Sequence, residues 1–197
     1  MIELRNICDK HDVILIFDEV QTGIGITGKM WAHEHFTIKP DIISFGKKTQ
    51  VCGMLAGERI YNMSDNVFKE SSRINSTFGG NLVDMYRFKL ILEIMCKENL
   101  FSNALEMGSY LLKYIKGLSD EFPGFITNPR GVGLFCAFDF PSTIERDRFI
   151  SKALAENLII LGSGDFSIRF SPHLNVKQKN IDIAFDIINK VVKKMLN

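Results

Sequence analysis

The spacing of apolar residues in the first part of the chain predicts a helix that leads into a sheet. Residues 2–11 carry apolar side chains at helical spacing. Residues 13–17 form an uninterrupted apolar run, which is typical of a parallel strand covered on both faces. Similar runs follow at 41–45 and 51–60. This part therefore predicts an α/β arrangement with about three strands.

The rest of the chain alternates helical and strand patterns. The pattern predicts helices at 82–97, 104–118, 145–157 and 177–195 and strands at 134–140, 158–161 and 167–170. The segment "NPRGVG", residues 128–133, introduces the strand predicted at 134–140. We expect three parts: a partial domain at 1–81, connecting helices at 82–124 and a compact α+β domain at 125–197.

The predicted first sheet is incomplete. A strand that is buried on both faces needs neighbouring strands and covering helices, and sheets usually contain about 5–6 strands. We therefore expect the missing strands to lie before Met1. The predicted fold class is α/β, with an incomplete, mainly parallel sheet joined to a complete α+β domain.

Charge and cysteine content argue against several kinds of partner. Lysine and arginine number 24 against 23 acidic residues, and a net charge of +1 creates no field that attracts nucleic acid or an anionic membrane. The four cysteines lack CxxC spacing, and His33 and His35 lack a cluster of acidic ligands, so no metal site is predicted. Without an apolar run near about 18 residues or a leader pattern, we expect a cytoplasmic protein.

Three glycines after the first strand match the GxGxxG spacing of a dinucleotide-binding fingerprint. They are Gly23, Gly25 and Gly28. In that fingerprint the first glycine turns directly off the strand, and a helix N-terminus receives the pyrophosphate. Here the intervening residues include Asp18 and Glu19, which would repel a pyrophosphate. We interpret the glycines as a sharp turn, with a nucleotide-binding oxidoreductase as an alternative.

The ends of the first two strands bring a carboxylate and an amine to one edge of the predicted sheet. Ligands of open α/β sheets bind there, where Asp18 follows one strand and Lys47 and Lys48 follow the next. Pyridoxal phosphate needs an amine to hold its aldehyde and a carboxylate to keep its ring nitrogen protonated. Val20 is placed to pack on the ring, and Gln21 to donate to its phenolic oxygen. Spacing alone leaves open which lysine reacts.

Three segments resemble the class III aminotransferases, the ornithine and 4-aminobutyrate type. They are "IFDEVQTGIGITGKMWAHEHFTIKPDIISFGKK", "NSTFGGN" and "PRGVGLFCAF". The resemblance covers essentially the whole chain and implies the C-terminal part of a fold-type I pyridoxal-phosphate-dependent transferase. Two departures, "GKKTQVCGM" and Leu82 after "GGN", are similar to members that transfer the ε-amino group of L-lysine to 2-oxoglutarate. The products would be 2-aminoadipate 6-semialdehyde and glutamate.

The resemblance also implies roles for individual residues. It places the Schiff base on Lys47 and the partner of the ring nitrogen on Asp18. Thr77 matches a threonine whose hydroxyl reaches the cofactor phosphate of the neighbouring subunit, which implies a homodimer. Arg169 matches the arginine that grips a substrate carboxylate, a task that suits a bidentate guanidinium. Asn75 is expected to touch the substrate.

The resemblance further implies parts of the site that would lie before Met1. These are the phosphate loop, an aromatic that stacks on the ring and a glutamate that masks the arginine. The sequence therefore predicts a fragment or one half of a split gene, with an N-terminal half as partner. The alternative within the family is an inactive remnant that only associates with a full-length subunit.

Overall fold

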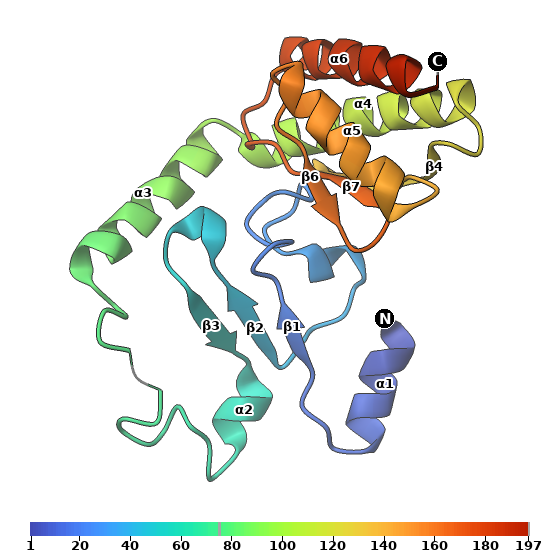
Figure 1. The fold of residues 1–197 in the computed structure, drawn as a ribbon. Helices are drawn as coiled ribbons and strands as arrows, with labels where there is room; N and C mark the ends of the chain where they lie inside the picture. Colours follow the sequence, from blue (N-terminus) through green and yellow to red (C-terminus); the bar gives the residue numbers. More distant parts are fainter. Residues whose placement is uncertain (75, 197) are drawn as a thin grey trace. The chain divides into compact units, whose positions relative to one another are not determined.

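The computed structural model describes residues 1–74 and 76–196, which form two compact units (Figure 1). The first unit comprises Met1–Gly25 and Lys29–Asn99, and the second comprises Ile26–Gly28 and the residues from Leu100 onward. These units place the helix at 82–97 in the first and the helix that begins at Leu100 in the second. The division into parts at 1–81, 82–124 and 125–197 stays a prediction.

The described residues of the first unit contain a three-stranded sheet with the order β1-β2-β3. The elements of this unit are α1 (Ile2–Lys10), β1 (Ile16–Asp18), η1 (Ala32–His35), β2 (Ile42–Phe45), η2 (Lys47–Thr49), β3 (Gly53–Ala56), α2 (Glu58–Asn62) and α3 (Leu82–Lys97). β1 and β2 are parallel, whereas β3 pairs with β2 in the antiparallel direction. Figure 1 shows β2 between the other two strands. The predicted α/β class, with part of a sheet in this unit, is confirmed.

The strands of the first unit differ from the apolar runs that predict them. The strand predicted at 13–17 begins only at Ile16, because Leu15 N donates to the side chain of Asp41 at 2.7 Å instead of to a strand partner. Val13 lies outside the strand and is 51% exposed, although it belongs to the apolar run that predicted a buried strand. The strand predicted at 51–60 is wrong in its second half, where β3 ends and α2 begins.

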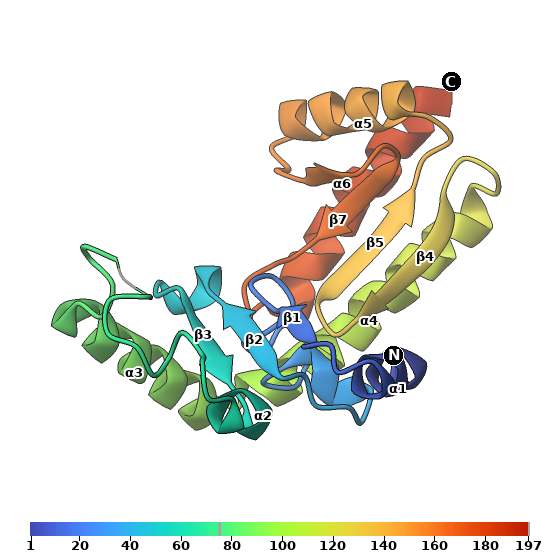
Figure 2. The ribbon, with the colours of Figure 1, turned by 90° about the horizontal axis from the view of Figure 1, so that it is seen from below.

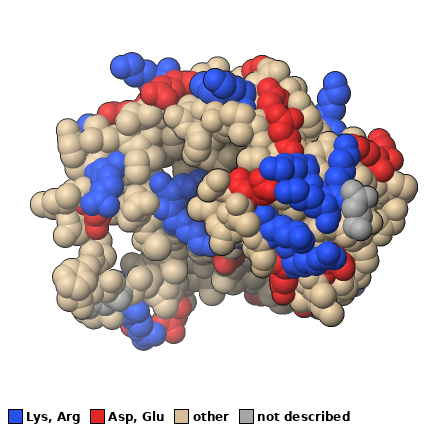
Figure 3. Space-filling model, turned by 45° about the horizontal axis from the view of Figure 1, so that its top comes forward, with Lys and Arg blue, Asp and Glu red and all other residues tan. Residues whose placement is uncertain are grey.

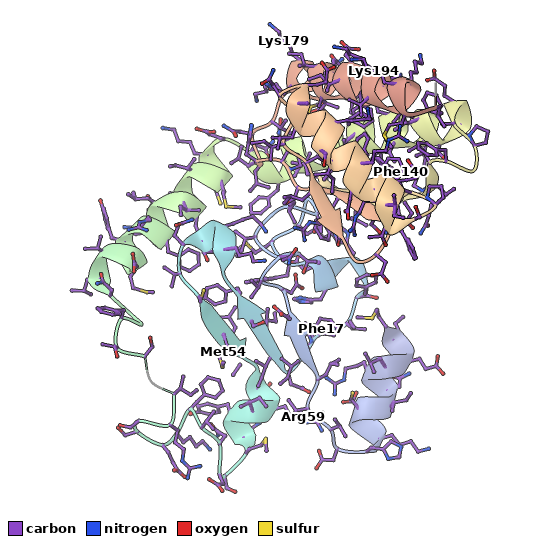
Figure 4. The ribbon with its side chains drawn as sticks, viewed as in Figure 1. Phe17, Met54, Arg59, Phe140, Lys179 and Lys194 are labelled. Atoms are coloured by element: carbon purple, nitrogen blue, oxygen red, sulfur yellow. The ribbon has the colours of Figure 1, made fainter. Side chains whose placement is uncertain are left out.

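An ionic cluster joins α1 and α2 to the start of β2. Asp41 is 8% exposed and accepts from Arg5 at 3.0 Å, and Arg59 of α2 lies 3.5 Å from the same carboxylate. Arg59, labelled in Figure 4, also contacts Asp9 in α1 and Asp12, two residues after α1 ends. A buried carboxylate is tolerated only when it is paired in this way. The cluster therefore fixes the point at which β2 enters the sheet.

The second unit contains a four-stranded antiparallel sheet with the order β4-β5-β7-β6 among its described residues. Its elements are α4 (Leu100–Glu121), β4 (Thr127–Val132), β5 (Phe135–Asp139), α5 (Thr143–Ala155), β6 (Leu161–Ser163), β7 (Ser167–Phe170) and α6 (Gln178–Leu196). Figure 2 shows α4 and α6 behind β4, β5 and β7. The predicted α+β architecture of this region is confirmed.

Aromatic residues build the core of the second unit. Phe138, Phe140 and Phe149 are almost fully buried, and their ring centroids lie 5.0–6.2 Å apart. α4 approaches the β4–β5 turn so closely that a Cβ on Gly108 would lie 2.1 Å from the carbonyl carbon of Gly133. Glycine is required at position 108 because any side chain would push the helix off the sheet. The sheet thus has a firmly packed helical cover.

The segment "NPRGVG", expected to precede the strand at 134–140, lies mostly within a strand of its own, β4, which ends at Val132. β4 includes Pro129 and Gly131 and lies at an edge of the sheet. A proline has no N–H to donate, and an edge strand tolerates it because one side of the strand has no partner. The pairing with β5 shifts register between Thr127 and Arg130, next to this proline. Turn-forming residues here mark an irregular edge strand.

The helices lie close to their predicted positions. α3 matches the predicted 82–97, and α4 extends beyond the predicted 104–118 at both ends. The strand predicted at 158–161 is displaced, and β6 begins at Leu161 because Leu158 N donates to Ala153 O to close α5. None of the helices in the described part of the chain is long and apolar enough to cross a membrane.

Lysines of α6 are paired with acidic residues. Lys190 and Lys194 contact Glu156 at 2.5 and 2.7 Å, and Lys193 contacts Glu121 at 2.9 Å. The hydrogen bonds from Lys190 and Lys194 lower the pKa of Glu156 to about 2. Figure 3 shows acidic and basic side chains interspersed on the viewed face. Each exposed pair is worth little alone, but together they link α6 to the ends of α4 and α5.

Candidate active site

The carboxyl ends of β1 and β2 lie at the same edge of the sheet in the first unit. The two strands are parallel, and Asp18 is opposite Ser44. Glu19 N donates to Ser44 O at 2.9 Å and extends the pairing one step beyond β1. Lys47 begins η2 directly after β2 and Gly46. The parallel pairing, on which the predicted meeting of Asp18 and Lys47 depends, is confirmed.

The Asp18 carboxylate is held through one of its two oxygens. Oδ1 accepts from Val20 N at 3.0 Å and from Ser44 Oγ at 2.9 Å. These two hydrogen bonds, followed by the charge of Lys47, hold the pKa of Asp18 below its ordinary value. Both hydrogen bonds described for the Asp18 carboxylate end on Oδ1. Asp18 is therefore an ionised group with one oxygen available to a cationic partner such as a protonated ring nitrogen.

The structure distinguishes the two adjacent lysines. Lys48 Nζ donates to Gln21 O at 2.7 Å, and its burial, with the charge of Lys47, lowers the pKa of Lys48 to about 8. Lys47 is exposed, and its backbone has a left-handed φ of 55°, which is costly for a residue with a side chain. Such strained backbone is concentrated at functional sites. Lys48 thus binds the loop after β1, whereas Lys47 extends from a strained turn.

The structure adds a buried acid, Glu19, that the sequence analysis did not single out as a site residue. Glu19 is 2% exposed and accepts from Ala32 N at 2.7 Å and His33 N at 2.8 Å. His33 Nδ1 lies 3.0 Å from Glu19 Oε1. Two amides at the start of η1 and an imidazole thus satisfy a carboxylate that burial would otherwise penalise. The adjacent acids in "FDEV" could have indicated this residue. Neighbouring side chains of a strand point to opposite faces, and here Asp18 is exposed and Glu19 is buried.

The glycine segment forms turns, as predicted. Its backbone is left-handed at Ile24, Gly25 and Gly28, with φ of 56°, 86° and 87°. A dinucleotide fingerprint requires a helix that opens at the last glycine, whereas the next helical element begins at Ala32. Gly23 has a packing role, because an added Cβ would lie 2.8 Å from Glu19 O. These observations favour the turn interpretation over a nucleotide site.

The other predicted site residues lie in several places. Val20, partly buried, and Gln21, exposed, follow β1 directly in the first unit. Thr77 is exposed in the segment between α2 and α3, and Asn75 lies outside the described residues. Arg169 is in β7 of the second unit, opposite Ala137 of β5 and Leu161 of β6. The roles of all of these residues stay predictions.

An α/β unit with a lysine and an ionised carboxylate at the ends of parallel strands fits the needs of pyridoxal phosphate. A sequence model of the family Aminotransferase class-III matches residues 1–192, and the chain belongs to this family. The predicted family is therefore confirmed.

Among curated relatives, the chain is similar to L-lysine-epsilon aminotransferases. That of Mycobacterium tuberculosis is 46% identical over 189 residues, which cover 96% of this chain and 42% of the relative. That of Streptomyces clavuligerus is 40% identical over 186 residues, or 94% of this chain and 41% of the relative. The solved structure of lysine aminotransferase from M. tuberculosis matches with a TM-score of 0.93 and 45% identity, covering 96% of this chain and 44% of that one. The chain thus spans less than half the length of these relatives.

Proposed function

We propose that the chain supplies the cofactor-anchoring part of a pyridoxal-phosphate-dependent aminotransferase that transfers the ε-amino group of L-lysine to 2-oxoglutarate. The observation that carries the proposal is the parallel pairing of β1 and β2, which brings Asp18 and Lys47 to one edge of the sheet in a class-III family member. The names of the lysine aminotransferases described above support L-lysine as amino donor. The products are 2-aminoadipate 6-semialdehyde and glutamate.

The residues of the first unit have complementary roles in this proposal. When bound, pyridoxal phosphate supplies an aldehyde and an electron-withdrawing ring that makes the carbon beside the substrate nitrogen acidic. Asp18 pairs with the ring nitrogen through Oδ2, Val20 packs on the ring, and Gln21 donates to the phenolic oxygen. Lys47 holds the cofactor covalently. Once free and neutral, Lys47 Nζ would take the proton from the substrate carbon as general base and, as general acid, deliver it to the cofactor carbon that had carried the aldehyde.

The proposal also includes residues that act on substrate and across subunits. Arg169 binds a carboxylate of 2-oxoglutarate, and Asn75 contacts the substrate. Thr77 donates from its hydroxyl to the cofactor phosphate of a neighbouring copy, so the working form is a homodimer. The homodimer is inferred from the family resemblance.

The proposed function is tested by assaying amino transfer with several donors. The chain is combined with the part of the M. tuberculosis relative that it does not match, and glutamate formation from 2-oxoglutarate is measured. We expect L-lysine to be used faster than ornithine or 4-aminobutyrate. The chain alone and the relative's part alone serve as controls. No glutamate with any donor would contradict the function, and a preference for another donor would contradict the substrate.

Replacement of Arg169 by glutamine is expected to raise the KM for 2-oxoglutarate about ten- to hundredfold, because a charge-assisted hydrogen bond is worth about 1.5–3 kcal/mol. The KM for L-lysine under saturating 2-oxoglutarate provides the comparison. Arg148→Gln, in which an exposed arginine of α5 is replaced, is the matched control and should leave both values unchanged. If Arg169→Gln changed the KM of neither substrate, the proposed role would be wrong.

A further inference from the structure

Ser44 contacts the Asp18 carboxylate across two parallel strands. The two residues are opposite each other in β1 and β2, and Ser44 Oγ donates to Asp18 Oδ1 at 2.9 Å. The main-chain oxygen of Ser44 accepts from Glu19 N at 2.9 Å. Ser44 therefore holds both the side chain of Asp18 and the main chain that follows it.

The hydroxyl of Ser44 is not needed to build the strand. β2 consists of Ile42, Ile43, Ser44 and Phe45, and Ser44 is its one polar side chain. Strand pairing uses main-chain groups, and branched or aromatic side chains suit a strand better than serine does. A polar residue in this apolar strand is explained by the group that it contacts, which is the Asp18 carboxylate.

Two hydrogen bonds constrain the carboxylate more than one does. The bond from Val20 N comes from the same chain segment as Asp18. The bond from Ser44 Oγ comes from the neighbouring strand and ends on the same oxygen, Oδ1. Together they fix the plane of the group and leave Oδ2 as the oxygen that meets a cationic partner. Both bonds also favour the ionised form.

We propose that Ser44 is a positioning residue that orients the Asp18 carboxylate for the ring nitrogen of pyridoxal phosphate. This inference rests on the proposed function of the first unit. Ser44 itself acts only through Asp18 and does not take part in proton transfer. A threonine at position 44 would keep the hydroxyl, whereas an alanine would leave Val20 N as the sole donor to Oδ1 among the hydrogen bonds described for this unit.

The test compares Ser44→Ala and Ser44→Thr with the unaltered chain. Without cofactor, the titration of the Asp18 carboxyl is followed by carbon-13 NMR, with the signal assigned through Asp18→Asn. Losing a donor to the carboxylate weakens the ionised form, so the midpoint should move to higher pH in Ser44→Ala and return in Ser44→Thr. Ser64→Ala, an exposed serine of the same unit, is the matched control and should change nothing.

The second measurement is the dissociation constant for pyridoxal phosphate, from its absorption on titration into the chain combined with the part of the M. tuberculosis relative that it does not match. We expect binding about two- to tenfold weaker for Ser44→Ala, which corresponds to one hydrogen bond, and near-normal binding for Ser44→Thr. If Ser44→Ala left either the carboxyl titration or the affinity unchanged, the positioning role would be overturned. Failure of the unaltered chain to bind would instead contradict the proposed function, and this inference would fall with it.

Discussion

Replacement of Lys47 by alanine is expected to remove covalent attachment of pyridoxal phosphate and to lower amino transfer by at least about 10²- to 10⁴-fold. The side chain extends from a strained turn at the end of β2 and is the amine that we assign to anchor the cofactor and to move the proton. Alanine supplies neither function. Absorption of the cofactor-loaded chain, borohydride reduction and mass spectrometry of the labelled peptide measure the attachment.

The adjacent lysine provides the control for this prediction. Lys48→Arg keeps a cation that can donate to Gln21 O, so labelling at position 47 should persist. Lys48→Ala removes that donor and should leave the label on Lys47, with weaker cofactor binding because the loop after β1 is less well held. A label found on Lys48, or one that survives in Lys47→Ala, would show that the assignment of the two amines is reversed.

Replacement of Asp18 by asparagine is expected to preserve covalent attachment of the cofactor but to reduce turnover about 10²- to 10³-fold. Asparagine has nearly the same shape, and its oxygen can still accept from Val20 N and Ser44 Oγ. It carries no charge, however, and cannot stabilise a protonated ring nitrogen. The electron-withdrawing effect on the substrate carbon is therefore weakened at the chemical step. Single-turnover rates with L-lysine measure this step directly.

Controls separate this effect from a loss of folding. Asp65→Asn, in which an exposed acid of the same unit is changed, should leave the single-turnover rate unaltered. The thermal unfolding midpoint of Asp18→Asn should stay close to that of the unaltered chain, because Asp18 is exposed. An unchanged rate in Asp18→Asn would mean that another group serves the ring nitrogen.

The helices and the antiparallel domain were predictable because their signals are local. α3 was predicted at the residues where it is observed, since apolar side chains three and four positions apart define a helix face. The strands were harder to place. Pro129 and Gly131 are loop residues in most contexts, and only the position of β4 at the edge of its sheet lets them form a strand. The apolar run at 13–17 gave no sign that Leu15 N would bond to Asp41.

The candidate site was predictable in its residue types and less so in its contacts. The placement of Asp18 and Lys47 after two apolar runs followed from the pattern and from the rule that ligands bind at the carboxyl ends of parallel strands. The same pattern could not distinguish Lys47 from Lys48, because the two are adjacent. It also passed over Ser44 and Glu19, whose partners are distant in the chain.

The sequence by itself determined the family, because the family's motifs are contiguous runs of residues that can be compared position by position. It also determined most helices, because helix periodicity is written along the chain. Only the tertiary structure decided which oxygen of Asp18 is held, that Lys48 is engaged with Gln21, and that Glu19 is buried against His33. Each of these contacts joins residues from different segments of the chain. The contacts at the strand ends depend on the register of β1 against β2, and this register exists only in the folded chain.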